Sequence, residues 1–212
     1  MRKIATGIAA ASALALAVGT AAPAAAADGT TSLAEVLTSD GGKQFDKNWH
    51  DFDIVTEAAL AVLAEKPRSA VGLLTQGDQA LTAFIPNDRA FRLLVRDLTG
   101  KKPRTEAATF KAVAGLGIDT VETVLLYHVV PAATITKKDA KQADRVGLTT
   151  GTGDTFMVQV RAKGKLIKLS DRDYNSRNPR VYKADINKGN MQIAHAIDRV
   201  LRPMDLPPIK KK

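Results

Sequence analysis

The side chains best suited to metal binding or proton transfer near neutral pH are three histidines, His50, His128 and His195. They lie far apart in the chain and share none of the short spacings that place two metal ligands side by side. The chain also contains no cysteine, which excludes disulfides, thiolate zinc sites, iron–sulfur clusters and a cysteine nucleophile. The sequence therefore predicts neither a metal centre nor a bound cofactor.

Two further segments match the motifs of ligand-binding loops only in part. Residues 171–175 (DRDYN) begin like a calcium loop, but Ser176 stands where glycine is needed and Tyr182 where glutamate is needed, so a solvated loop is expected. Residues 147–153 (GLTTGTG) carry glycines, but a phosphate-binding loop is followed directly by a helix, and a strand is expected here. The motifs of serine hydrolases, zinc proteases and nucleotide-binding enzymes are missing, and we predict that the protein is not an enzyme.

The chain is basic, and its excess of positive charge lies in the C-terminal half. The net formal charge is +9, and residues 137–183 alone hold twelve basic and five acidic side chains. One group lies on an expected hairpin and on the loop after it: Arg161, Lys163, Lys165, Lys168, Arg172, Arg177 and Arg180. It predicts either a solvated face that protects a sheet edge or a surface for anionic cell-envelope polymers or membrane headgroups. Nucleic acid is not the expected partner, because base-stacking aromatic residues are not interleaved with the basic ones.

The first 27 residues have the pattern of a secretory signal peptide. Met1–Lys3 is basic, residues 4–22 form an alanine-rich apolar run, and Ala25–Ala27 offers a cleavage site with small residues. A transmembrane helix is the other interpretation, but the run is barely long enough, and no later segment approaches the ~20 apolar residues of a membrane span. We expect a secreted domain over residues 28–206, which fits a bacterial origin, and a disordered basic tail over residues 207–212.

Helical periodicity dominates the first half of the expected domain. Apolar residues at helical spacing predict helices over residues 53–65, 88–98, 105–114 and from residue 119 to about 128. A short strand over residues 81–85 interrupts them, and Pro86 ends it because proline cannot donate to a strand ladder.

Helix starts are indicated by capping residues. Asn87 or Asp88 is expected to cap the helix over residues 88–98, and Asp119 and Glu122 stand at the spacing of a capping box. The inner face of the helix over residues 88–98 is expected to carry four apolar side chains: Phe91, Leu94, Val95 and Leu98.

After Pro131 the hydrophobic period changes from that of a helix to two. Strands are expected at residues 145–149, 156–161, 166–169, 181–186 and 191–201, with a turn at Lys163–Gly164. Helices followed by a run of antiparallel strands predict an α+β fold, with the helices on one side of a β-sandwich-like body.

Three segments resemble the signatures of the fasciclin (FAS1) domain. Residues 81–91 (LTAFIPNDRAF) are similar to its first signature, T-x-F-A-P-[ST]-[ND]-x-A-F, and residues 125–130 (LLYHVV) to its central Tyr-His motif. Residues 193–203 (IAHAIDRVLRP) are similar to its second signature, V-I-H-V-I-D-x-V-L-x-P. The segments stand in family order, and the resemblance spans about residues 32–206. It implies a FAS1-like, wedge-shaped β-sandwich with a helical layer.

The motif residues are expected first to be structural. Phe84 and Phe91 are expected to face the core, Tyr127 to be buried with its hydroxyl hydrogen-bonded, and His128 to bond either the 88–91 segment or a nearby backbone carbonyl. The remaining motif residues are Pro86, Asp88, His195 and Asp198.

Animal members of the family use the Tyr-His region and a second sequence, E-P-D-I-M, in integrin-dependent adhesion. The matching stretch here is Lys183–Asn187, in which Asp185 and Ile186 agree but a base replaces the acid and alanine the proline. These departures weigh against an integrin-type partner. The resemblance implies a secreted, non-enzymatic adhesion or interaction module at or near a bacterial surface, held by a cell-envelope polymer or a surface protein. The alternative is an extracellular carrier of a small apolar or glycan ligand, bound between helices and sheet.

Overall fold

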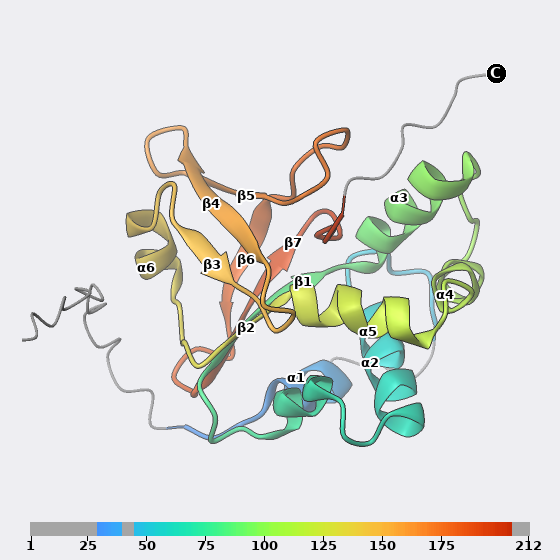
Figure 1. The fold of residues 1–212 in the computed structure, drawn as a ribbon, viewed down its shortest axis with the longest axis horizontal. Coiled ribbons are helices and arrows are strands. Elements are labelled where there is room, and N and C mark those ends of the chain that lie inside the picture. The colour runs from blue at the N-terminus through green and yellow to red at the C-terminus, as the bar shows by residue number, and fades with distance from the viewer. Residues whose placement is uncertain (1–28, 40–44, 205–212) are drawn as a thin grey trace, which may run out of the picture.

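The computed structural model describes residues 29–39 and 45–204. They form three layers: a group of helices, a four-stranded sheet and a three-stranded sheet (Figure 1). The expected signal peptide over residues 1–27 and the expected tail over residues 207–212 lie outside the described residues. Within the described ranges, the helices are too short or too polar to cross a membrane.

The helical elements alternate with strands through the first two thirds of the domain. They are α1 (Leu33–Ser39), α2 (Asp53–Glu65), the 3-10 helix η1 (Ala70–Thr75), α3 (Asp88–Thr99), α4 (Glu106–Ala114), α5 (Ile118–Tyr127) and α6 (Lys137–Gln142). The helices predicted to begin near residues 53, 88, 105 and 119 are confirmed. The sequence does not predict α1, η1 or α6, because elements of six or seven residues are too short to show a helical period.

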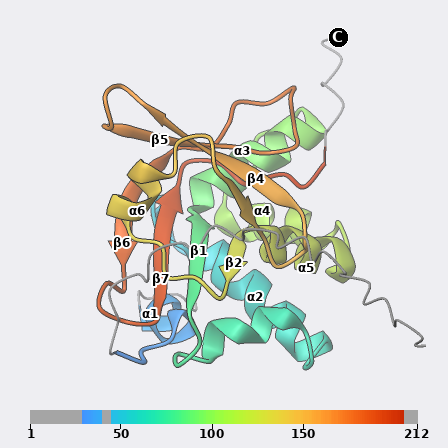
Figure 2. The same cartoon turned by 60° about the vertical axis from the view of Figure 1, so that its left-hand side comes forward.

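The strands fall into two sheets that lie on one another (Figure 2). They are β1 (Leu81–Pro86), β2 (Val129–Pro131), β3 (Gly147–Thr149), β4 (Thr155–Arg161), β5 (Leu166–Ser170), β6 (Val181–Ile186) and β7 (Gln192–Ile197). The four-stranded sheet has the order β2-β1-β7-β6 and the three-stranded sheet the order β3-β4-β5. The predicted α+β class is therefore confirmed.

The pairing of β1 with β7 differs from the expected antiparallel run. These two strands are parallel, in a register that joins Leu81 to Gln192 and Pro86 to Ile197. Every residue of both strands is buried, which is typical of a parallel pair covered on both faces. Pro86 ends β1, as predicted.

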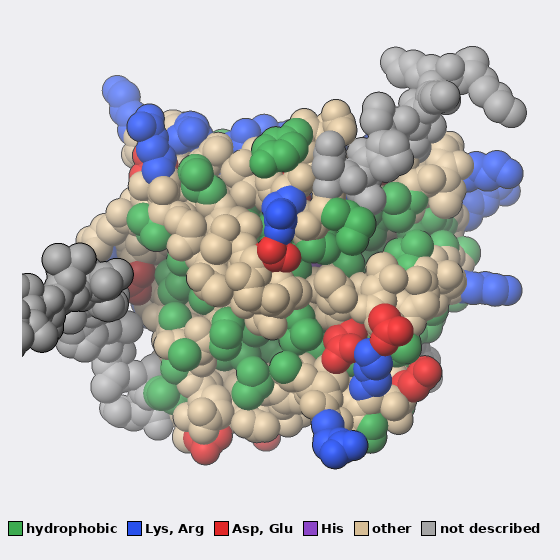
Figure 3. Space-filling view, viewed as in Figure 1, with side chains coloured by type: hydrophobic (Ala, Val, Ile, Leu, Met, Phe, Trp, Pro, Cys, Tyr) green, Lys and Arg blue, Asp and Glu red, His purple; other side chains and the backbone are tan. Residues whose placement is uncertain are grey.

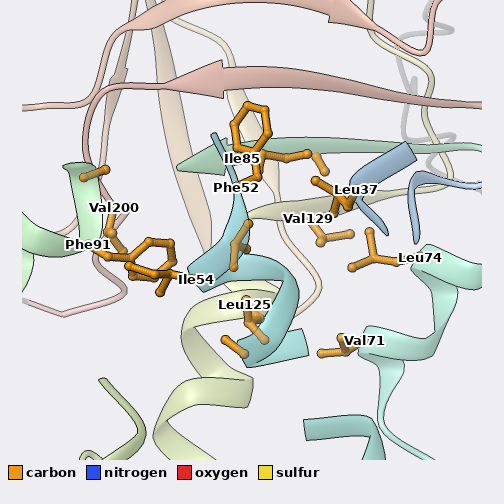
Figure 4. Close-up of a cluster of buried hydrophobic side chains, with 14 of the residues drawn as sticks. Leu37, Phe52, Ile54, Val71, Leu74, Ile85, Phe91, Leu125, Val129 and Val200 are labelled. Atoms are coloured by element: carbon orange, nitrogen blue, oxygen red, sulfur yellow. The ribbon is translucent and has the colours of Figure 1, made fainter. Parts of the chain in front are cut away.

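The larger core lies between the helices and the four-stranded sheet (Figure 4). Ile54 of α2, Phe91 of α3 and Leu125 of α5 meet Ile85 of β1 there. Leu81, Ala83 and Ile85 alternate along β1 toward this core, as the period of a strand requires. Leu98, predicted on the inner face of α3, is instead 38% exposed, because α3 extends beyond this core at its C-terminal end.

A smaller core lies between the two sheets. Phe84 points to this side of β1 and contacts Phe156 of β4 edge to face, with ring centroids 5.2 Å apart. Tyr127 contacts the same Phe156 ring at 6.1 Å. The alternation of Phe156 and Val158 along β4 therefore closes a sandwich, as the period of two predicts.

One expected helix cap is confirmed and one is wrong. Asn87, not Asp88, caps α3 by accepting the N–H of Ala90, at 3.0 Å. The cap residue of α5 is Gly117, and no side chain caps this helix. Asp119 and Glu122 instead pair with Lys66 at the end of α2, since tertiary ion pairing offers their carboxylates a charged partner.

Candidate functional site

The Tyr-His pair at the end of α5 is buried and fully engaged. The Tyr127 hydroxyl donates to the Thr155 carbonyl at 3.0 Å, and burial raises the pKa of this phenol. His128 donates from Nδ1 to the Val124 carbonyl at 2.7 Å and accepts the Leu201 N–H at Nε2, at 2.8 Å. The expected hydrogen bond to a nearby backbone carbonyl is thus present. Burial lowers the pKa of His128 to about 4, against the raising effect of the Val124 carbonyl, so the ring is neutral at pH 7.

His195 on β7 makes the same kind of clamp with the opposite tautomer. Its Nε2 donates to the Ile135 carbonyl at 2.8 Å, and its Nδ1 accepts the Asp185 N–H at 3.3 Å. The ring is 1% exposed and lies against Phe84, and burial lowers its pKa. Because both nitrogens of both rings bond backbone groups, neither His128 nor His195 offers a free nitrogen for proton transfer or metal binding.

The stretch that matches the E-P-D-I-M sequence is used inside the domain. Asp185 has a φ of 59° within an irregular stretch of the β6–β7 pairing, which turns its carboxylate toward α6, where it accepts the Lys137 N–H at 2.6 Å. Ile186 packs against the larger core. The structure therefore assigns internal contacts to both residues that match the animal sequence.

The remaining motif residues also join elements of the fold. Asp88 is fully buried and accepts the Ile54 N–H at 2.9 Å, so it caps α2 across space instead of its own helix. Asp198 accepts the Arg180 N–H at 2.7 Å, just before β6 begins. Phe84 and Phe91 face the two cores, as predicted.

The loop after β5 is not the solvated loop that was expected. Asp171 and Asp173 are buried, and both bind Arg202: Asp171 accepts its N–H at 2.9 Å, and Asp173 accepts its guanidinium at 2.7 Å. Arg202 also donates to Asp97 of α3 at 2.7 Å. Burial raises the pKa of Asp171 to about 6, although the N–H groups of Arg202 and Asp173 oppose this. The acidic loop therefore carries a buried ion-pair network that ties the three-stranded sheet to α3.

The structure divides the seven basic residues into paired and unpaired ones. Arg172 pairs with Asp154, and Arg161 lies 3.5 Å from the carboxylate of Asp144. Arg180 is half-buried, beside Lys168 on the neighbouring strand. Within residues 29–39 and 45–204, the structure places no ion pair on Lys163, Lys165, Lys168 and Arg177.

Lys168 lies on the side of the three-stranded sheet that faces away from the core, Lys163 and Lys165 lie in the β4–β5 turn, and Arg177 lies in the loop after β5. Lys168 stands opposite Gln159 across the β4–β5 ladder, whereas Val158 and Leu169 point inward. Basic side chains project at the edge of the molecule around the β4–β5 hairpin (Figure 3). Tyr174, on the loop that carries Arg177, is 86% exposed. We call Lys163, Lys165, Lys168, Arg177 and Tyr174 the basic face.

The cavity lined by the larger core, between helices and sheet, is small. It measures about 30 Å³ and is lined by apolar side chains of the larger core together with His128. Sites for small organic ligands usually measure at least ~300 Å³. A second hollow is an open depression around Lys66 and Glu122, outside the helix–sheet interface. This cavity is therefore smaller than the usual site of a small organic ligand.

Some residues of structural or chemical interest escape the sequence analysis. Arg202 is one, because nothing in its local sequence indicates its two acidic partners. The other case is a group of carboxylates around Asp51: Asp46, Asp53, Asp88 and Glu106. The acidic residues at 46, 51 and 53 were a signal, but Asp88 and Glu106 lie far from them in the sequence.

Comparison with known proteins agrees with this fold. The model of the Fasciclin domain family matches residues 59–203. A solved structure of a FAS1 domain pair from the insect cell adhesion molecule Fasciclin I matches with a TM-score of 0.57 and 17% sequence identity, over 82% of this chain and 51% of the solved chain. This chain therefore spans about half the length of that pair, and the match at this identity shows the fold alone. Comparison with curated proteins gave no match.

Proposed function

Because the chain belongs to the fasciclin domain family, we propose that it is a secreted, non-enzymatic adhesion module that binds anionic polymers of a bacterial cell envelope through the basic face. The family supports an adhesion or interaction role. The N-terminal sequence supports export, because a basic start, an apolar run and small residues precede Asp28.

One observation carries the proposal: among the described residues, the cations of the β4–β5 hairpin and of the loop after β5 include four that form no ion pair. Lys163 and Lys165 are exposed in the β4–β5 hairpin, and Lys168 follows on β5. Tyr174 adds an aromatic ring to the same surface, and an exposed aromatic beside cations suits contact with a polymer that carries both sugar or acyl groups and negative charge. The basic face can therefore bind by charge without any reactive group.

The hydrogen bonds of two histidines support the proposal that the protein is not an enzyme. His128 and His195 spend both ring nitrogens on backbone groups. A histidine that acts as a general base needs a ring nitrogen within reach of a substrate proton, and neither of these two rings provides one.

The test is salt-dependent retention of the chain on purified cell wall or on an immobilised anionic polymer. We expect retention at low salt that weakens steeply above 0.1 M salt, where the screening length is about 10 Å. The triple variant Lys163→Glu/Lys165→Glu/Lys168→Glu should weaken binding on the order of 100-fold, because each lysine near an anionic surface contributes about 1 kcal/mol.

The matched control changes the same charge elsewhere. Lys101, Lys102 and Arg104 are exposed on the loop between α3 and α4, on another part of the surface. The triple variant Lys101→Glu/Lys102→Glu/Arg104→Glu alters the net charge equally and should retain most of the binding. Equal loss in both variants would show that net charge, and not the basic face, determines retention, and would contradict the proposal.

A further inference from the structure

Five carboxylates converge where three helices begin. Asp53, Asp88 and Glu106 are the first residues of α2, α3 and α4, and Asp46 and Asp51 lie in the loop before α2. We call these five residues the carboxylate cluster. Single oxygens of Asp46, Asp51 and Glu106 lie within 4.8 Å of one another, and so do those of Asp51, Asp53 and Asp88. Asp51 belongs to both sets and stands at the centre of the cluster.

Backbone hydrogen bonds hold the cluster together. The N–H groups of Asp88 and Arg89, in the first turn of α3, donate to the carbonyls of Asp51 and Trp49, at 3.1 and 3.0 Å. The Asp88 carboxylate in turn accepts the Ile54 N–H of α2 at 2.9 Å. The loop and two helix starts are therefore fixed relative to one another, independently of the attraction or repulsion between the carboxylates.

Several oxygens of the cluster are buried without a hydrogen-bond partner. Glu106 is 0% exposed, and neither of its carboxylate oxygens is hydrogen-bonded. The same holds for Oδ2 of Asp88, which is also 0% exposed, and for Oδ1 of Asp51. A buried polar atom without a partner costs free energy, and native proteins rarely keep several in one place. The oxygens belong to two overlapping sets that share Asp51, and buried carboxylate oxygens without partners point to a ligand within the cluster.

The described residues place no ion pair on four of the five carboxylates: Asp46, Asp51, Asp88 and Glu106. Arg92, on the same side of α3, lies 4.1 Å over the ring of Trp49 and donates to the Pro103 carbonyl. Four of the five carboxylates therefore have no ion-pair partner among the described residues.

We propose that the carboxylate cluster binds a calcium ion, with Asp51 as the ligand shared by both sets. Ca²⁺ takes six to eight oxygen ligands at about 2.4 Å in flexible geometry, and two such ligands lie at most about 4.8 Å apart. The spacing of the cluster fits this limit. Mg²⁺ fits less well, because it requires a near-octahedral shell and retains its water. A bound ion would join the starts of α2, α3 and α4.

The proposal is independent of the basic face. The family model matches residues 59–203, so three residues of the cluster, Asp46, Asp51 and Asp53, precede the matched region. The proposed site therefore combines these three residues with Asp88 and Glu106, which lie inside the matched region.

Thermal unfolding of the full chain, after removal of metals with EDTA, tests the site. Calcium chloride at about 100 times the dissociation constant should raise the Tm by about 5–10 °C, because an ion that binds only the folded state stabilises it by mass action. Titration calorimetry with calcium chloride alone should give one site with a dissociation constant below about 1 mM. Magnesium chloride at the same concentration should give a smaller Tm shift, and an equal shift would overturn the choice of calcium.

Single substitutions distinguish a carboxylate that binds calcium from one that only supports the fold. Asp51→Asn and Glu106→Gln should abolish the calcium-dependent rise in Tm while leaving the Tm in EDTA unchanged or higher, since each removes charge repulsion. The matched control is Asp78→Asn, at an exposed position outside the cluster, which should keep the full calcium response.

Two outcomes would overturn the proposal. One is a Tm that calcium chloride up to 10 mM does not change. The other is a calcium response that persists in Asp51→Asn.

Discussion

The ring of His128 accepts the backbone N–H of Leu201 at 2.8 Å. Through this bond the end of α5 is joined to the segment that follows β7, and the second ring nitrogen is held by the Val124 carbonyl one turn earlier in α5. The backbone carbonyl of His128 also accepts the Phe84 N–H of β1 at 2.9 Å. All three sequence motifs therefore meet at one neutral, buried histidine.

Replacement of this ring should destabilise the fold. His128→Ala leaves the buried N–H of Leu201 without an acceptor and opens a cavity between α5 and β7, which together should cost about 2–4 kcal/mol of unfolding free energy. Urea denaturation at pH 7 measures the change. His50→Ala, at an exposed position, is the control and should change stability by less than about 0.5 kcal/mol. An unchanged midpoint in His128→Ala would refute the clamp.

The same ring predicts a loss of stability in acid. Its pKa is lowered from 6.5 to about 4 in the folded protein, so between these values the unfolded chain binds a proton that the folded chain does not. Stability should therefore fall as the pH decreases through this window, by about 1.4 kcal/mol per pH unit and by about 2 kcal/mol at pH 5. Denaturation curves at pH 7, 6, 5 and 4.5 measure the loss.

Other groups titrate in the same range, so the contribution of His128 is read from a difference. Asp171 and Glu106 have raised pKa values, and their effect on stability has the opposite sign. The variant His128→Gln keeps a neutral hydrogen-bonding side chain and should lack the acid loss assigned to the ring. Parallel pH profiles for the wild-type chain and His128→Gln would contradict the prediction.

The network around Arg202 predicts a second set of stability changes. Its guanidinium is held by Asp173 and Asp97, each at 2.7 Å, and Asp173 is 1% exposed. Although burial opposes it, the hydrogen bonds from Arg96 and Arg202 lower the pKa of Asp97. Asp173→Asn should cost about 3 kcal/mol, because removal of one partner leaves buried charge uncompensated.

A double-mutant cycle measures the coupling in this network. Arg202→Met alone should also destabilise the chain, but Arg202→Met/Asp173→Asn should lose clearly less than the sum of the two single changes, since no buried charge of that pair remains. Strict additivity would show that Asp173 and Arg202 do not stabilise one another.

The sequence predicts the elements whose burial repeats along their length. The apolar stripe of α2 and the alternation of Phe156 and Val158 in β4 each extend over several periods, so these elements and the α+β class can be predicted. The parallel pairing of β1 with β7 cannot, because it joins strands from opposite ends of the domain, and a period of two does not specify strand direction. A helix cap is hard to predict where a group from elsewhere in the fold binds the capping side chain, as the Ile54 N–H binds Asp88.

The sequence predicts which charged residues belong to the candidate site, but it does not predict which of them form ion pairs. The basic side chains of the β4–β5 hairpin follow from the sequence, yet only the structure shows that Asp154 pairs with Arg172. The acidic loop at Asp171 and Asp173 looks solvated in the sequence because its partner, Arg202, lies after β7. Local patterns indicate charge, whereas the tertiary fold decides which charges are neutralised.

The exposed ring of Tyr174 offers a prediction that separates binding from stability. With 86% of its surface exposed, it contributes little to folding, so Tyr174→Ala should change the unfolding free energy by less than about 0.5 kcal/mol. If the basic face contacts a polymer, loss of the ring should weaken retention on cell wall by roughly 3–10-fold, since an aromatic contact contributes about 0.5–1.5 kcal/mol. Met204→Ala, at another exposed apolar side chain, is the control and should bind as the wild type does. Undiminished retention of Tyr174→Ala would remove the aromatic ring from the basic face and leave recognition to the cations alone.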